Sequence, residues 1–219
     1  MKAPDAPYHP PALRAYARAR HDASAGLRAA RVLAACATLA LAIAMAIVRS
    51  SDGSAAYLEG VVTRGLSLHL LLVALPFGYA LAGRRVGDRD ASFTLAALHG
   101  VDRRAFDATM ALQALRAAGL RGAAGAGLLA AEMVVLSLPE ASLASKRAAL
   151  ALAFAATGAA LGAALALLGL AAARAAGRFG RLAFIGAWAL PSLLAGLVPG
   201  YPAWGTLLGA YRTWLGVLL

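Results

Sequence analysis

Long runs of apolar residues, almost free of charge, alternate along the chain with shorter segments that hold most of the charged residues. A helix rises 1.5 Å per residue, so about 20 apolar residues are needed to cross a hydrocarbon core of about 30 Å. Five runs approach or exceed that length. They predict transmembrane helices at residues 32–48, 65–82, 122–138, 148–173 and 182–198.

A sixth apolar segment, residues 201–219, contains Arg212. If this segment crosses the membrane, Arg212 falls in the inner half of the span. Insertion then costs up to about 2.5–3.5 kcal/mol unless the side chain snorkels or pairs. If the segment lies along the outer interface, its Tyr and Trp side chains sit at headgroup level. The pattern predicts an all-α, polytopic membrane helix bundle of about six spans. For the sixth segment it allows both a membrane crossing and a position along the outer interface.

Composition and charge agree with a membrane protein. Hydrophobic residues make up 61% of the chain, against roughly 45–50% in soluble domains. The net charge of +11 would suit a nucleic-acid-binding protein, but the arginines flank the apolar runs instead of interleaving with aromatic residues. Of the 21 Lys and Arg residues, sixteen fall in the N-terminal segment and alternate loops, and four in the loops opposite. By the positive-inside rule we expect a multi-pass protein of the cell inner (cytoplasmic) membrane, its N-terminus cytoplasmic, with no nucleic-acid partner.

Residues 1–31 form a basic segment ahead of the first apolar run. Four prolines, and the lack of an apolar stretch before Val32, argue against a signal peptide. The pattern from Pro11 to Arg31 is helical, and proline suits a first helical turn. We expect a basic amphipathic helix on the cytoplasmic face of the membrane, the alternative being a solvated basic leader. The chain then divides into this segment and a transmembrane domain of residues 32–219.

The loop after the second run, residues 84–121, is too long and too patterned for a simple connector. Asp88 or Asp90 can cap a short helix over residues 91–98. Gly100 then suits the left-handed position that often follows a helix.

A second helix follows Asp102, which is suited to capping it. No helix breaker occurs until Gly119, so this helix can continue directly into the span predicted at residues 122–138. The loop therefore predicts a short helix, a tight turn and a long helix that enters the membrane. We call residues 88–110 the knob; its shape suits docking into a groove on a cytosolic partner.

The knob reads DRDASFTLAALHGVDRRAFDATM and resembles a loop of one transporter family. The family is the permease subunits of ATP-binding-cassette (ABC) transporters of the type-2 exporter superfamily. Between their second and third spans, a charged lead-in precedes a short coupling helix rich in Thr and Leu, a turn and a basic pair. The matching residues here are Asp88, Arg89 and Asp90 for the lead-in, Thr94, Leu95 and Leu98 for the coupling helix, and Arg103 and Arg104 for the basic pair.

The short chain, the amphipathic N-terminal helix and the six spans are also similar to that family. Three features depart from it: the usual Gly-Thr pair is missing, Gly100 stands where proline is common, and no lysine follows the basic pair. The motif itself covers about twenty residues.

The resemblance implies a permease that dimerises with a second permease copy, docks a separate ABC ATPase subunit through the coupling loop at residues 84–110, and exports a substrate. The family's even number of spans favours the crossing of residues 201–219. The length also matches the haem-exporter-like permeases, although no motif selects haem over lipid, drug or peptide. The implied docking residues are Asp90, Phe93, Thr94, Leu95, Leu98, Arg103 and Arg104.

We expect no catalytic activity from the chain itself. A phosphate-binding P-loop requires G-x-x-x-x-G-K-[ST], and neither Lys2 nor Lys146 lies in such a setting. The sequence also contains no G-x-S-x-G or H-E-x-x-H motif. Its four histidines follow no ligand spacing and Cys36 is its only cysteine, so we expect no metal or cofactor.

Two ionisable residues fall inside predicted spans, His69 in the second and Glu132 in the third. Ionisable groups at membrane depth are costly, so both are candidates for a translocation path. The alternatives are that Glu132 is hydrated near the outer interface and that His69 is a packing residue. Small residues spaced as G-x-x-x-G allow close helix packing; these pairs are Gly158 with Gly162 and Gly205 with Gly209.

A function of another class remains open. The chain could be a non-transporting membrane scaffold whose basic loop, residues 84–121, recruits a cytosolic protein. Copurification of an ATPase distinguishes the two functions.

Overall fold

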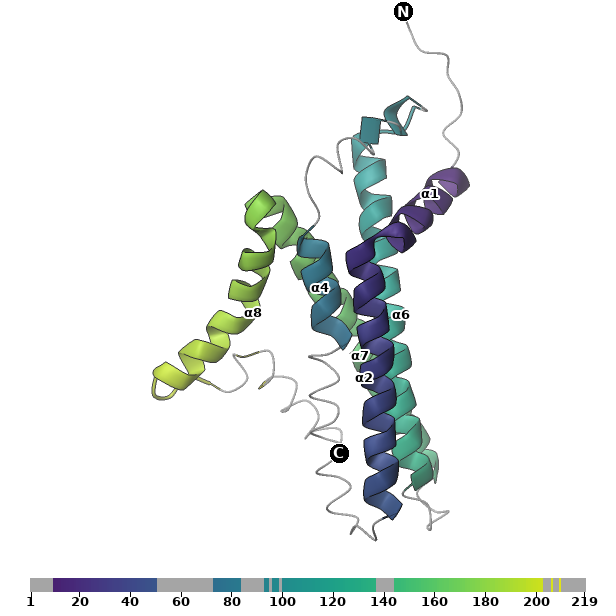
Figure 1. Ribbon diagram of the computed structural model, residues 1–219, viewed down its shortest axis with the longest axis vertical. Helices are drawn as coiled ribbons and strands as arrows, with labels where there is room; N and C mark the ends of the chain where they lie inside the picture. Colours follow the sequence, from purple (N-terminus) through teal and green to yellow (C-terminus); the bar gives the residue numbers. More distant parts are fainter. Residues whose placement is uncertain are drawn as a thin grey trace, which may run out of the picture.

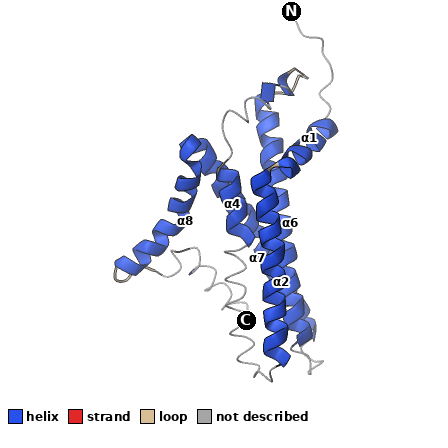
Figure 2. Ribbon diagram, in the orientation of Figure 1, coloured by secondary structure: helices blue, strands red, loops and turns tan. Residues whose placement is uncertain are grey.

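The computed structural model describes residues 10–50, 73–83, 93–94, 96–98, 100–136, 144–202, 206 and 209. This part of the chain is helical and contains no strand (Figure 2), which confirms the all-α class for it. The helices are α1 (Pro10–Ala23), α2 (Ala25–Ser50), α4 (Leu75–Ala82), α6 (Arg103–Leu136), α7 (Ala144–Ala176) and α8 (Gly180–Leu197), with a 3₁₀ turn, η3 (Gly177–Phe179), before α8.

Three long helices form the body of the molecule (Figure 1). α6 and α7 run antiparallel and pack along each other, and α2 packs against α6. The short α4 packs against α7, α2 and α8. α1 crosses the first part of α6 near one end of the bundle.

The α6–α7 contact depends on residues without bulky side chains. A Cβ atom added to Gly122 would overlap the carbonyl oxygen of Gly158, and one added to Gly158 would overlap the oxygen of Gly122. One turn further along α7, a Cβ on Gly162 would come within 2.5 Å of the Ala118 oxygen. The two backbones therefore approach as closely as small residues allow. This confirms that Gly158 and Gly162 are packing residues.

α4 and α8 meet α7 in a similar way. A Cβ on Gly169 would overlap the Gly78 oxygen, and the ring of Phe184 occupies the space beside Gly78. Phe184 is fully buried, whereas Leu190 and Leu197 further along α8 are exposed. Accordingly, only the first part of α8 packs on the bundle, and the rest diverges from it (Figure 1).

The N-terminal helix differs from its prediction. The pattern predicted one helix from Pro11 to Arg31, but the chain breaks at Ser24, where α1 ends and α2 begins. Serine favours caps and helix ends because its side chain competes for backbone hydrogen bonds. The break allows α1 to cross α6 while α2 runs along it.

Two stretches are long and apolar enough to cross a membrane by length and composition: Ala25–Ala44, and Leu152–Leu197 with its bend at η3. The helices do cover the runs predicted at 32–48, 148–173 and, up to Leu197, 182–198. α6 carries the run predicted at 122–138 as far as Leu136. Of the run predicted at 65–82, the structure describes residues 73–82, which include α4; the earlier part, and all but four residues of the run at 201–219, lie outside the described residues. The described part thus supports two candidate membrane helices, and the count of six stays a prediction.

Candidate functional site

The knob is the segment in which the sequence concentrates its candidate docking residues. The structure describes Phe93, Thr94, Leu98, Arg103 and Arg104. The two other candidates, Asp90 and Leu95, lie outside the described residues.

A Schellman turn ends the short helix of the knob. The Gly100 amide donates to the Ala97 carbonyl (3.0 Å), and the Val101 amide donates to the Ala96 carbonyl (3.2 Å). Gly100 has a φ of 72°, a left-handed conformation that costs a residue with a Cβ about 1–2 kcal/mol. The two residues that the longer bond joins, Ala96 and Val101, are both buried in one apolar cluster. The prediction of a left-handed Gly100 is confirmed.

Asp102 begins the next helix, as predicted. Its Oδ2 accepts hydrogen bonds from the amides of Arg104 (2.9 Å) and Ala105 (3.4 Å), two of the amides that a helix leaves without a carbonyl partner. α6 then continues without interruption for 34 residues. The knob is therefore continuous with a single helix that ends at Leu136.

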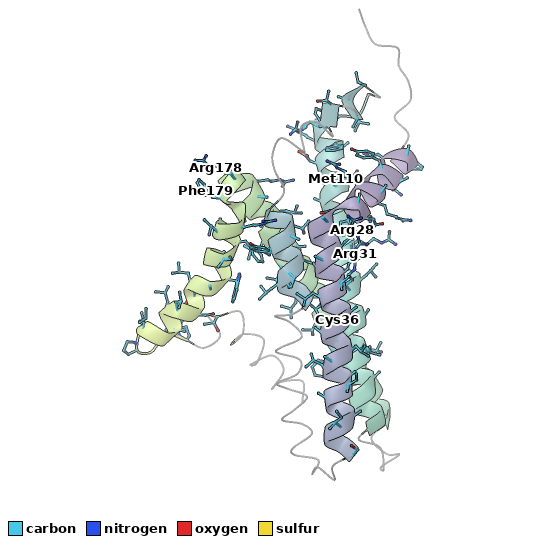
Figure 3. All side chains as sticks on the ribbon, in the orientation of Figure 1. Arg28, Arg31, Cys36, Met110, Arg178 and Phe179 are labelled. Carbon is cyan, nitrogen blue, oxygen red and sulfur yellow. The ribbon has the colours of Figure 1, made fainter. Side chains whose placement is uncertain are left out.

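An apolar cluster fixes the knob to α1. Phe106 is fully buried, with the ring of Phe93 at 5.7 Å in an edge-on arrangement and that of Tyr16 at 6.5 Å. Leu13 is buried in the same cluster, and Met110 packs against it; Met110 lies where α6 passes α1 (Figure 3). Phe93 is thus half-buried inside the knob rather than fully presented to a partner.

Arg103 is likewise engaged within the knob. Its guanidinium lies 4.6 Å from the centre of the Phe93 ring, and its Nε is 3.7 Å from Asp107 Oδ2 one turn along the helix. Thr94, Leu98 and Arg104 are exposed, and Leu98 exposes 75% of its surface. Among the described docking candidates, these three side chains are therefore the ones most accessible to a partner.

The two candidates for a translocation path are not brought together by the described part of the chain. Glu132 lies in the last part of α6, with its side chain outside what is described, and His69 lies outside it altogether. Within the described residues, no group of three His, Cys, Asp or Glu side chains could hold a metal ion.

The sequence did not predict the contact that holds the knob in place. The apolar pattern places Leu13 and Tyr16 in the N-terminal helix and Phe106 in the helix after Asp102, but it assigns none of the three a place in the docking site. Such isolated large side chains are a signal for a buried face. The sequence does not show which element they contact.

No family model, curated protein or solved structure matches the chain.

Proposed function

We propose that this chain is the permease subunit of an ABC exporter and that its knob docks a separate ATPase subunit. The observation that supports this most is the construction of the knob. A Schellman turn, a capped helix and an aromatic cluster hold a short helix with an exposed leucine at the start of a continuous 34-residue helix. Movement of an ATPase during its cycle would act on α6 through that contact.

The proposed topology has six spans, with the N-terminus, the knob and η3 in the cytoplasm. Support comes from the direction of the helices. The start of α2, the start of α6 and the α7–α8 turn lie toward one end of the bundle, and the ends of α2 and α6 lie toward the other (Figure 1). The first group contains the basic segments of the sequence. The positive-inside rule would place that end in the cytoplasm of an inner-membrane protein.

The surface of the candidate membrane helices supports insertion. In each of the two stretches, only 28% of the most apolar 18-residue segment is buried inside the molecule. The outward side of α2 exposes a row of large apolar residues, which are Val32, Leu39, Ile43 and Ile47. A soluble protein rarely exposes a continuous apolar patch larger than a few hundred Å², whereas lipid tails cover such a surface. Dimerisation with a second permease copy belongs to the same proposal.

The docking experiment replaces Leu98 with Asp and measures copurification of the ATPase. A buried charge in place of an apolar anchor usually costs ~2 kcal/mol or more of binding, so the yield of ATPase should fall strongly. Phe93→Asp is unsuitable, since Phe93 supports the internal packing of the knob.

Leu112→Asp is the matched control, because Leu112 is also an exposed leucine, on α6 outside the short helix of the knob. We expect this variant to retain the ATPase. Wild-type recovery with Leu98→Asp would contradict docking through the knob. Recovery of a non-ATPase protein that depends on Leu98 would favour the scaffold function instead.

A further inference from the structure

A cluster of charged residues lies where α1, α2, α4 and α6 meet, outside the knob. At its centre, Arg31 donates from Nη1 to Asp22 Oδ1 (2.9 Å), from Nη2 to the Asp22 carbonyl (2.8 Å) and from Nε to the Leu27 carbonyl (3.3 Å). The two bonds to Asp22 connect α2 to the end of α1, across the break at Ser24. Arg31 is thereby held in one position with its side chain 27% exposed.

Arg121 of α6 occupies the same region from another side. Its guanidinium lies 5.0 Å from the centre of the Phe77 ring on α4, and its Nη1 donates to the Ala117 carbonyl at 3.4 Å. The apolar cluster beneath contains Leu27 and Ala30 of α2, Phe77 of α4 and Ala118 of α6. Arg31 and Arg121 therefore border one interhelical contact.

The charges at this contact are unequal. Within the described part of the chain, this contact contains three guanidinium groups, those of Arg28, Arg31 and Arg121, and one carboxylate, that of Asp22. Arg28 and Arg31 lie together beside the α1–α2 junction (Figure 3). Burial lowers the pKa of Arg121, the charge of Arg31 lowers that pKa further, and Asp22 raises it. An anion here would relieve this repulsion.

The position along the helices indicates the source of such an anion. Arg31 immediately precedes the predicted span at residues 32–48, and Arg121 immediately precedes the one at 122–138. Both guanidinium groups then fall at headgroup depth on the same side of the membrane. Guanidinium groups bind phosphate oxygens through paired, charge-assisted hydrogen bonds, and basic sites between membrane helices bind anionic headgroups.

We propose that Arg31 and Arg121, with Arg28 beside them, bind the phosphate of an anionic phospholipid headgroup between α2, α4 and α6. Phe77 supports one face of the Arg121 guanidinium, and Asp22 fixes Arg31. The bound headgroup connects the N-terminal helix to the bundle. This inference rests on the membrane location of the proposed function, but not on the ATPase contact.

The experiment uses the full-length protein in lipid nanodiscs that contain equal amounts of phosphatidylglycerol and phosphatidylcholine. Native mass spectrometry then measures the ratio of the two lipids that stay bound. We expect the wild type to retain phosphatidylglycerol preferentially and Arg121→Gln to lower that ratio about fivefold, the effect of one basic residue near an anionic surface. Arg121→Lys keeps the positive charge but not the paired hydrogen bonds, so it should lower the ratio less than Arg121→Gln does.

Arg116→Gln is the matched control, since Arg116 is exposed on the same helix. It should leave the ratio unchanged. An equal loss in Arg116→Gln and Arg121→Gln would overturn the site, because general surface charge would then explain the preference. An equal loss in Arg121→Lys and Arg121→Gln would also overturn it, because the loss would then follow from altered packing.

A third arm separates lipid from free phosphate. Displacement of phosphatidylglycerol by millimolar inorganic phosphate would overturn the lipid assignment, and retention would support it. ATPase copurification with Arg121→Gln is measured in parallel. We expect it to be kept, so that a failure of the lipid site and a failure of the docking proposal give different results.

Discussion

At the scale of single residues, glycine decides how closely the helices approach. Gly122 and Gly158 face each other so closely that neither position has room for a Cβ. Within the described part of the chain, no heavy atom outside the local backbone of α8 lies within 4 Å of where a Cβ of Gly186 would stand. The two sites therefore separate the packing role of a glycine from its effect on helix propensity.

We predict that two glycine substitutions change the stability of the folded protein in opposite directions. Gly122→Ala forces α6 away from α7, and overpacking of this kind costs about 1–3 kcal/mol. Gly186→Ala meets no neighbour and should gain up to about 1 kcal/mol from the better helix propensity of alanine. Thermal unfolding of both variants in the same detergent measures the difference. A fall in melting temperature of the same size for both would show that the α6–α7 contact does not depend on Gly122.

At the scale of elements, the knob depends on one side-chain cap. Asp102 Oδ2 accepts from the amides of Arg104 and Ala105, and a lost cap of this kind costs about 1 kcal/mol. We therefore predict that Asp102→Ala speeds hydrogen exchange at these two amides about fivefold, while Asp102→Asn, which keeps a side-chain oxygen, stays close to the wild type. Exchange followed by mass spectrometry measures the rates. Unchanged exchange in Asp102→Ala would show that the Asp102 cap does not stabilise the start of α6.

The same elements show which features a sequence can predict. Gly100 and Asp102 were predicted because turn and cap chemistry is local: a left-handed residue and a side-chain acceptor are needed within a few positions of the helix ends. The half-burial of Phe93 was not predicted, since it follows from contact with Phe106, thirteen positions away. The break at Ser24 was missed because apolar spacing alone favours a continuous helix there. The pairing of Arg31 with Asp22 across that break is likewise a tertiary feature.

At the scale of the whole molecule, exposed apolar residues extend along the helices, whereas most of the described arginines lie toward one end of the bundle. Large apolar residues are exposed along α2 and along α8 beyond Phe184, while the arginines of α1, of the first part of α6 and of the α7–α8 turn lie toward that end (Figure 1). This is the distribution that a bilayer requires of a protein that crosses it, with apolar side chains toward lipid and cations beside the cytoplasmic headgroups. This distribution supports the proposed orientation.

The orientation is tested with single cysteines in a Cys36→Ala background. Arg178 is exposed in η3, in the end of the bundle that we place in the cytoplasm, and Ser50 is exposed at the far end of α2. We predict that a membrane-impermeant maleimide labels Ser50→Cys but not Arg178→Cys in right-side-out spheroplasts, and labels both after permeabilisation. The physical reason is that transferring the sixteen basic residues of the alternate loops across the membrane would oppose the positive-inside rule. Labelling of Arg178→Cys before permeabilisation, with Ser50→Cys shielded, would invert the topology and place the knob on the side where no ATPase can reach it.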